Sequence, residues 1–212
     1  GRLYMVHLSS GNTLQGLKDK YADVLNQGFY VETCPQYLTF TRDRLHDADG
    51  RLYTFAPPLR TKREQALLKK HFDDVHSIGT DHAPFLSTEK AKERLEDIPL
   101  GIGSVEHAFN ILYHTFGDPL IDKMTMNPAK RMGLFPKKGT LEIGSDADIT
   151  IVEKTGERTI EQDHSACDYS LYKGKTVSTR ILSTVSRGRF IIRDGTLEEK
   201  QGHWQKGRGI HD

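Results

Sequence analysis

The sequence has few cysteines and no long apolar run, and each absence excludes a class of protein. The two cysteines, Cys34 and Cys167, are far apart and form no Cys-x-x-Cys pair. This spacing argues against a disulfide framework or a zinc finger and is typical of a reducing compartment. No segment approaches the ~18 consecutive apolar residues of a membrane span, and the N-terminus has no apolar signal region. We therefore expect a cytoplasmic protein with no membrane partner.

An excess of charge of either sign is also missing. The thirty basic and twenty-nine acidic residues nearly cancel, for a formal net charge of +1, and no basic run stands out. Nucleic acids and anionic membrane surfaces are attracted by a strong positive field, which this composition does not provide. We therefore expect no nucleic-acid partner.

The order of the predicted elements is typical of a parallel α/β domain. The elements are strands at 3–7, 29–31 and 75–79, and helices at about 12–26, 61–72 and 86–97. Thr61, with Glu64 three residues later, predicts the start of the helix at 61–72 as a capping box. Alternation of strands with helices favours parallel strands joined by helical crossovers.

The pattern of the sequence changes near residue 136. Beyond this point, short strands separated by turns are predicted at 139–152 and 177–193. A complete (β/α)8 barrel takes about 250 residues, so a chain of 212 residues cannot contain one in addition to this β segment. We therefore divide the chain into an α/β part, residues 1–136, and a β part, residues 137–212.

Two of the predicted strands lead into a side chain that can bind a metal. His7 closes the strand at 3–7, and Asp81 follows the strand at 75–79. The carboxyl ends of parallel strands meet at one edge, where the βα loops of a barrel build its active site. Imidazole and carboxylate groups are ligands of zinc-type ions. A lone histidine in this position is more often structural, however, so the pattern alone leaves both interpretations open.

Several further motifs occur in an order that resembles one enzyme family. They are the segments 32–38 (ETCPQYL), 57–60 (PPLR), 79–85 (GTDHAPF), 127–130 (NPAK) and 144–148 (GSDAD). Together with His7, they resemble the second half of a cyclic-amide hydrolase of the amidohydrolase superfamily, most closely the dihydropyrimidinase and D-hydantoinase group. The resemblance implies the C-terminal part of a (β/α)8 TIM-type metallohydrolase barrel in residues 1–136. It implies part of a small β-sandwich in residues 137–212.

The resemblance also implies a binuclear centre with two divalent ions, zinc being the expected metal. His7 corresponds to the sixth-strand histidine that binds one ion. Asp81 corresponds to the eighth-strand aspartate that binds the other ion and carries a proton during catalysis. The remaining ligands of the family, a His-x-His pair, a carboxylated lysine and a fifth-strand histidine, would all precede residue 1. We therefore expect this chain alone to be inactive.

The substrate-binding positions also follow from the resemblance. The family binds the –CO–NH–CO– edge of the ring largely through backbone groups at the positions of Ala56 and Leu100, where hydantoinases and dihydropyrimidinases usually carry serine and asparagine. Phe85 stands where dihydroorotases usually carry histidine, and Gln36 stands where allantoinases tend to carry one. Both differences favour an uncharged cyclic ureide, such as a dihydropyrimidine or a hydantoin. The expected reaction is metal-dependent hydrolysis of a ring C–N bond.

Other functions stay open at this point. Allantoinase or dihydroorotase activity would keep the same chemistry on a different ring. A non-catalytic dihydropyrimidinase-related assembly protein would keep the fold but lack metal ligands in the part that precedes residue 1. A sugar- or peptide-binding α/β domain would leave the ordered motifs unexplained. For the full-length protein, the resemblance implies a homo-oligomer, with a homotetramer as the expected state.

Overall fold

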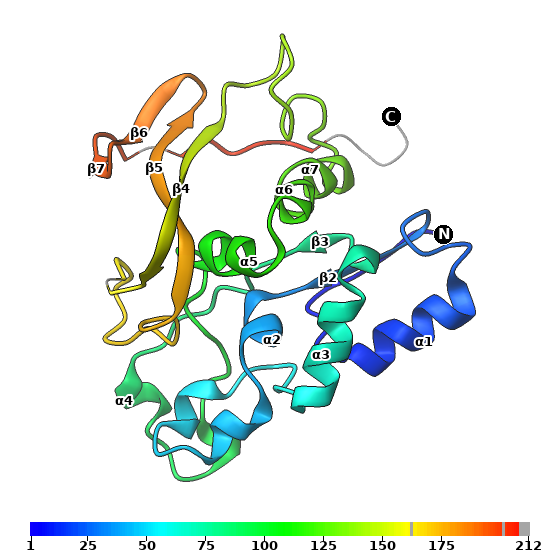
Figure 1. Ribbon diagram of the computed structural model, residues 1–212, viewed down its shortest axis with the longest axis vertical. Coiled ribbons are helices and arrows are strands. Elements are labelled where there is room, and N and C mark those ends of the chain that lie inside the picture. Colours follow the sequence, from blue (N-terminus) through cyan, green and yellow to red (C-terminus); the bar gives the residue numbers. More distant parts are fainter. Residues whose placement is uncertain (162, 201, 208–212) are drawn as a thin grey trace. The chain divides into compact units, whose positions relative to one another are not determined.

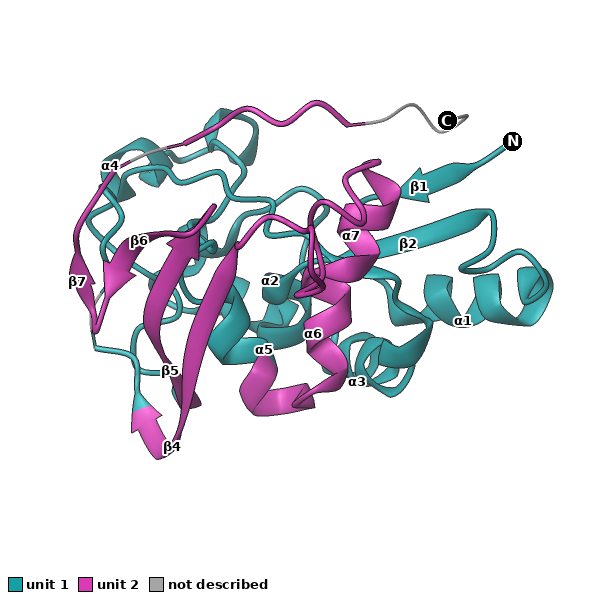
Figure 2. Ribbon diagram, turned by 90° about the horizontal axis from the view of Figure 1, so that it is seen from above, with its two compact units in different colours: residues 1–112, 159–176 teal, residues 113–158, 177–212 magenta. Residues whose placement is uncertain are grey.

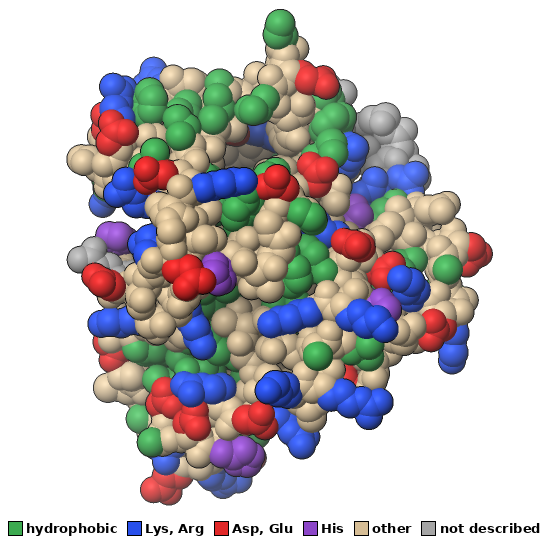
Figure 3. Space-filling view, in the orientation of Figure 1, with side chains coloured by type: hydrophobic (Ala, Val, Ile, Leu, Met, Phe, Trp, Pro, Cys, Tyr) green, Lys and Arg blue, Asp and Glu red, His purple; other side chains and the backbone are tan. Residues whose placement is uncertain are grey.

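A computed structural model gives the structure of the protein and describes residues 1–161, 163–200 and 202–207. The chain folds into two compact units. The first consists of Gly1–Leu112 and Thr159–Thr176, and the second of Tyr113–Arg158 and Val177–Asp212 (Figure 2). Basic and acidic side chains are interspersed over the face shown in Figure 3, in keeping with the small net charge. None of the helices in the described ranges is long and apolar enough to span a membrane.

The elements follow the chain as labelled in Figure 1. The first unit contains β1 (Leu3–Met5), α1 (Gly11–Tyr21), β2 (Phe29–Thr33), α2 (Pro35–Thr39), η1 (Arg42–His46), η2 (Gly50–Tyr53), α3 (Lys62–Lys70), η3 (Phe72–Asp74), β3 (Ser77–Ile78), α4 (Ser87–Lys90) and η4 (Leu95–Asp97). Helix α5 (Ala108–Phe116) continues from the first unit into the second. The remaining elements are α6 (Pro119–Met124), α7 (Met126–Arg131), β4 (Ile149–Thr159), β5 (Thr176–Ser186), β6 (Arg189–Arg193) and β7 (Thr196–Leu197).

The first unit is built on a parallel sheet with the strand order β1-β2-β3. Leu3 lies opposite Phe29 in one pair of strands, and Glu32 lies opposite Ser77 in the other. Val31, in the central strand, is fully buried. The predicted parallel α/β arrangement is therefore confirmed, and the three strands end at one edge of the sheet.

A network of polar side chains crosses all three strands. The Tyr4 hydroxyl of β1 donates to Oε2 of Glu32 in β2 over 2.6 Å, and its oxygen lies 2.6 Å from Ser77 Oγ in β3. The Glu32 carboxylate occupies the space beside Gly79, where a Cβ would lie 2.5 Å from its Cδ atom. Glycine is therefore the residue that fits at position 79, immediately after β3.

Helix α1 begins earlier and ends earlier than the sequence predicts. Its cap is Ser10, whose Oγ accepts a hydrogen bond from Thr13 N over 3.1 Å. The helix ends at Tyr21, and the chain turns through Asn26, which has a φ of 61°. Two apolar residues of the predicted helix lie beyond this end. Val24 is 40% exposed, whereas Leu25 is buried and forms an isolated bridge with Phe29, so the turn buries Leu25 without further helix.

The predicted cap of α3 is confirmed, but its acidic partner has a different role. Thr61 Oγ1 accepts from Glu64 N over 3.2 Å. The Glu64 carboxylate accepts from Ser10 Oγ over 2.8 Å and from Asn12 N over 3.0 Å. Partial burial opposes ionisation of Glu64, yet these hydrogen bonds outweigh it and hold the pKa below its ordinary value. One carboxylate therefore joins the starts of α1 and α3.

Two sequence predictions of secondary structure were wrong. The helix expected at 86–97 is broken into α4, which ends at the buried Lys90, and the 3-10 turn η4. The two strands expected at 139–152 are reduced to the start of β4 at Ile149. Leu141 and Ile143 alternate like a strand, yet both side chains are exposed. An alternating pattern forms a strand only where a partner strand and a covering surface are present.

The second unit contains β-hairpins with glycine turns. The sheet order is β4-β5-β6-β7, and β6 is antiparallel to both β5 and β7. Its two turns are Arg187-Gly188 and Asp194-Gly195, and all four residues have positive φ. Two-residue turns of this kind match the right-handed twist of the paired strands. The β structure predicted at 177–193 is confirmed.

Close packing of α1 on α3 generates a matched pair of variants. A Cβ on Gly11 would lie 2.6 Å from Leu68 N, whereas a Cβ on Gly16 of the same helix would meet nothing within 4 Å. We expect Gly11→Ala to lower the free energy of unfolding by about 1–3 kcal/mol. Gly16→Ala should raise it by roughly 0.5–1 kcal/mol, because alanine favours helix. Urea denaturation followed by circular dichroism measures both, and equal stabilities would contradict the close contact.

Candidate functional site

The predicted metal ligands follow neighbouring segments at the carboxyl edge of the parallel sheet. Leu8 N, directly after His7, donates to Glu32 O over 2.8 Å. On the other side of β2, Gly79 N donates to Thr33 O over 3.1 Å. The segments that carry His7 and Asp81 are therefore both hydrogen-bonded to the end of β2. This is the arrangement that places βα loops at one mouth of a parallel barrel.

The backbone at both predicted ligands has an unusual conformation. Five non-glycine residues of the described chain have positive φ. Arg187 and Asp194 lie in hairpin turns and Asn26 lies in the turn after α1. His7 (φ 42°) lies two residues after β1, and Asp81 (φ 49°) lies three residues after β3. A side chain in this region costs about 1–2 kcal/mol. Strained residues of this kind concentrate at active sites, because the strain fixes the direction of a side chain.

Buried groups after β2 surround this edge with a low-dielectric environment. Cys34 is fully buried, and burial, together with the negative charges of Glu32 and Asp81, raises the pKa of its thiol. Burial also raises the pKa of Tyr37, with further contributions from Cys34 and Asp81, and the Tyr37 hydroxyl donates to Pro57 O over 3.0 Å. The thiol and the phenol therefore stay protonated at neutral pH. Asp81 itself, by contrast, is exposed.

The residues that flank the two predicted ligands are held by side-chain hydrogen bonds. Arg60 Nε donates to Ser9 Oγ over 3.0 Å, which ties the Pro-Pro-Leu-Arg segment to the loop after His7. His82 Nδ1 accepts from Ser104 N over 3.0 Å. Ser104 Oγ donates to Thr80 O over 2.7 Å. Asp81 therefore lies between two residues that are both fixed to Ser104.

The three predicted substrate-binding residues lie on segments that contact one another. Gly101 N, next to Leu100, donates to Thr54 O over 3.1 Å, two residues before Ala56. A Cβ on Gly101 would lie 3.0 Å from the ring of Phe85. Ala56 is exposed, Phe85 is half-buried and Leu100 is 45% exposed. The structure therefore brings these segments together and leaves side-chain surface on each of them open to contact.

Lys90 was missed as a candidate, because a lysine within a run of charged residues is usually solvated. Its side chain is fully buried, and its Nζ donates to Thr54 O over 3.0 Å. The residues next to Lys90 in the chain give no signal of this burial, because it depends on the contact with Thr54.

The described residues contain one group of three potential metal ligands, and it includes neither His7 nor Asp81. Glu106, His107 and Asp163 each offer a ligand atom within 4.8 Å of the others. His107 Nε2 lies 3.0 Å from Asp163 Oδ2, and His164 Nδ1 lies 2.7 Å from Glu106 Oε1. The hydrogen bond that the Glu106 carboxylate accepts from the imidazole raises the pKa of His164. The four side chains form two acid–imidazole pairs that join residues 106–107 to residues 163–164.

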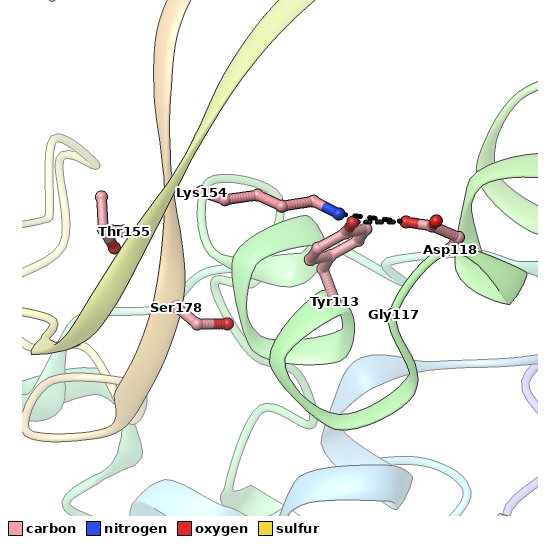
Figure 4. Close-up of a pocket in the computed structure, with 6 residues that line it drawn as sticks. All are labelled: Tyr113, Gly117, Asp118, Lys154, Thr155 and Ser178. Atoms are coloured by element: carbon pink, nitrogen blue, oxygen red, sulfur yellow. Dashed lines mark hydrogen bonds and ion pairs between the residues drawn. The ribbon is translucent and has the colours of Figure 1, made fainter.

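The second unit contains a surface hollow of about 390 Å³ (Figure 4). It is lined by Tyr113, Gly117, Asp118, Lys154, Thr155 and Ser178. Tyr113 donates to the Asp118 carboxylate, and Lys154 Nζ lies 3.7 Å from the same group. These contacts lower the pKa of Asp118. The charged groups of the hollow neutralise one another, and none of the residues predicted from the sequence lines it.

Known proteins similar to this chain point to a single family. The sequence model of the amidohydrolase family matches residues 5–191. A D-hydantoinase of Streptomyces coelicolor is 32% identical over 216 residues, covering 95% of this chain and 46% of that protein. A D-phenylhydantoinase of Escherichia coli K12 is 33% identical over 214 residues, covering 94% of this chain and 46% of that protein.

Solved structures agree with the sequence comparison. A crystal structure of a D-hydantoinase superposes with a TM-score of 0.87 at 30% identity, covering 93% of this chain and 46% of that one. A dihydropyrimidinase from Brevibacillus agri NCHU1002 superposes with a TM-score of 0.86 at 32% identity, with the same coverage. This chain therefore spans about half the length of the relatives that it matches.

The positive φ at Asp81 predicts an inverted response to glycine and alanine. We expect Asp81→Gly to be at least as stable as the wild type. The free energy of unfolding of Asp81→Ala should be about 1–2 kcal/mol lower than that of Asp81→Gly, because only glycine adopts this conformation without strain. Asp19 lies inside α1 and serves as the control. There the alanine variant should be the more stable of the two by roughly 1 kcal/mol. Urea denaturation of the four variants measures these free energies of unfolding. If the alanine variant is the more stable one at both positions, backbone strain at Asp81 is contradicted.

Proposed function

The chain belongs to the amidohydrolase family, and from this membership we propose that it is part of an enzyme that hydrolyses a cyclic amide with two divalent metal ions. One observation carries the proposal. His7 and Asp81 follow strands of one parallel sheet, both in a strained conformation, in a chain about one-third identical to hydantoinases. Such strain is retained where a side chain must point in one direction.

The donor set of the chain fits the proposed metal centre. His7 offers an imidazole nitrogen and Asp81 a carboxylate, both of which suit zinc and similar divalent ions. Cys34 does not supply a thiolate ligand, because burial and the neighbouring carboxylates raise the pKa of its thiol. The one group of three potential ligands among the described residues includes neither His7 nor Asp81. In the proposal, the remaining ligands, including a carboxylated lysine, come from parts of the full-length protein outside this chain.

The chemistry of the proposed reaction assigns a proton-transfer role to Asp81. When bound, the divalent ions supply Lewis acidity toward the ring carbonyl and lower the pKa of water toward neutrality. Asp81 would take the proton of the attacking water and transfer it to the ring nitrogen that leaves. A carboxylate is suited to this role when it is within hydrogen-bond reach of both atoms.

The proposed substrate is an uncharged cyclic ureide, such as a dihydropyrimidine or a hydantoin. Backbone groups at Ala56 and Leu100 would bind the –CO–NH–CO– edge of the ring, and Phe85 would form an apolar wall. The exposed side chain of Leu100 and the half-buried ring of Phe85 support an uncharged ligand. The relatives that the chain matches are named hydantoinases and dihydropyrimidinases.

The proposal also covers the architecture of the full-length protein. Strands β1, β2 and β3 would be the sixth to eighth strands of a (β/α)8 barrel in residues 1–136. The strands from β4 onward would belong to a small β-sandwich in residues 137–212. The parallel pairing of the first three strands and the antiparallel pairing of β5 with β6 support this division. We further propose a cytoplasmic, zinc-dependent homotetramer.

Replacing Asp81 tests the catalytic proposal in the full-length protein. We expect Asp81→Ala to lower kcat for hydantoin or dihydrouracil by at least about 10²–10⁴-fold, the typical worth of general acid–base catalysis. Asp194→Ala is the control, because Asp194 has nearly the same φ (48°) but lies in the β6–β7 turn. Its kcat should stay at the wild-type value. Asp81→Ala with more than a tenth of wild-type kcat would refute the proton-transfer role, and this chain alone should show no turnover.

Replacing Phe85 tests the substrate proposal. We expect Phe85→Ala in the full-length protein to change the ratio of kcat/KM between an aryl-substituted hydantoin and dihydrouracil, because apolar contacts in a pocket are worth about 1–3 kcal/mol. Phe190→Ala in β6 is the control and should leave the ratio unchanged. Steady-state kinetics on dihydrouracil, hydantoins, allantoin and dihydroorotate measures both. A wild-type preference for dihydroorotate would overturn the assignment of an uncharged ring.

A further inference from the structure

Lys90 is a charged residue in an unusually enclosed place. It is the last residue of the short helix α4, and its side chain is fully buried. Its Nζ donates to Thr54 O over 3.0 Å and lies 3.3 Å from Thr54 Oγ1. The ring centroid of Phe55 lies 5.7 Å from the same nitrogen. Among the ion pairs of the described residues, none involves Lys90, so its contacts are a carbonyl, a hydroxyl and an aromatic ring.

Burying an amine in this way is unfavourable. Desolvation lowers the pKa of Lys90 to about 8, so the group stays mostly protonated at neutral pH without a carboxylate partner. A methionine of similar length would fill the same volume without that penalty. Filling the volume does not require a charged side chain. The presence of a lysine is therefore explained by the group to which its ammonium donates, Thr54 O.

The acceptor of Lys90 lies at the meeting point of two segments. Thr54 O accepts from Lys90 Nζ over 3.0 Å and from Gly101 N over 3.1 Å. A carbonyl has two lone pairs, and both are used here, one for the ammonium group and one for the neighbouring segment. An ionised donor makes the stronger of such hydrogen bonds. Lys90 is thus bonded to the atom that connects residue 54 to residue 101.

These segments carry all three of the proposed substrate-binding residues. Ala56 follows Thr54 by two residues, and Leu100 directly precedes Gly101. The ring of Phe85 lies beside Gly101, where a Cβ would be 3.0 Å from it. Ala83 N donates to Ile102 O over 2.9 Å and joins the segment of Phe85 to that of Leu100. The buried ammonium group is hydrogen-bonded to Thr54 O, the carbonyl that also accepts from Gly101 N.

We propose that Lys90 is a positioning residue that holds the segments of Ala56, Phe85 and Leu100 in one arrangement through Thr54 O, and thereby sets the affinity for the ring. This inference rests on the proposed function for the identity of the ring. The holding of the segments is independent of that function, since it depends only on contacts within this chain.

Amide hydrogen exchange on this chain tests the positioning. Lys90→Met keeps the buried volume but removes the donor, and Lys92→Met, two residues along on an exposed position, is the matched control. In Lys90→Met, the Gly101 amide should exchange about tenfold faster or more, because the segment of Thr54, no longer held by the ammonium group, opens more often. Lys92→Met should leave that rate unchanged, and Lys90→Arg, which keeps a charged donor, should restore part of the protection. An unchanged Gly101 rate in Lys90→Met would overturn the proposal.

Kinetics of the full-length protein test the consequence for the ring. Lys90→Met should raise KM for the best ureide about tenfold, as expected for roughly one displaced polar contact, and change kcat less than about threefold. Metal content should stay at the wild-type value, and Lys90→Arg should recover part of the KM. A loss of about tenfold in kcat with no change in KM would overturn a positioning role. A wild-type protein that hydrolyses no ureide would refute the proposed function, and the exchange rate of Gly101 would still decide the positioning.

Discussion

The arrangement of the candidate site depends on β2, the central strand of the parallel sheet. Its end accepts a hydrogen bond from the segment after His7 on one side and from the segment before Asp81 on the other. The Tyr4–Glu32–Ser77 network then fixes all three strands to one another through side chains. Because the strands are parallel and in register, their ends cannot slide independently. The relative position of the two predicted ligands is thus determined by pairing within the sheet.

Strain and rigidity have complementary roles at this edge. His7 and Asp81 are in a backbone conformation that opposes folding. The residues around them are held by hydrogen bonds that Arg60 donates to Ser9 and that Ser104 donates to Thr80 and His82. A strained residue persists only where its surroundings over-determine it. The flanking hydrogen bonds supply that constraint, so the local conformation is explained without a bound ligand.

The sequence predicted features that depend on local chemistry. The Thr61 cap, the glycine turns of the β-hairpins and the abrupt strand ends at His7 and Asp81 all follow from residues close together in the chain. The sequence did not predict features that depend on tertiary contacts. Lys90 reads as a solvated lysine until Thr54 is placed beside it, and Leu141 and Ile143 alternate like a strand that finds no partner. The positive φ at Asp81 was likewise not predictable, because the residues beside it in the chain do not require that conformation.

The hydrogen bonds of Glu64 to the start of α1 make the loop that contains His7 an acid-sensitive part of the first unit. These hydrogen bonds hold the pKa of Glu64 below the ordinary value, so their contribution to stability is complete above that value and disappears as the pH falls through the depressed one. Protonation would then release Ser10 and Asn12 together, three and five residues after His7. One structural consequence of acid would therefore be a loosening of this loop.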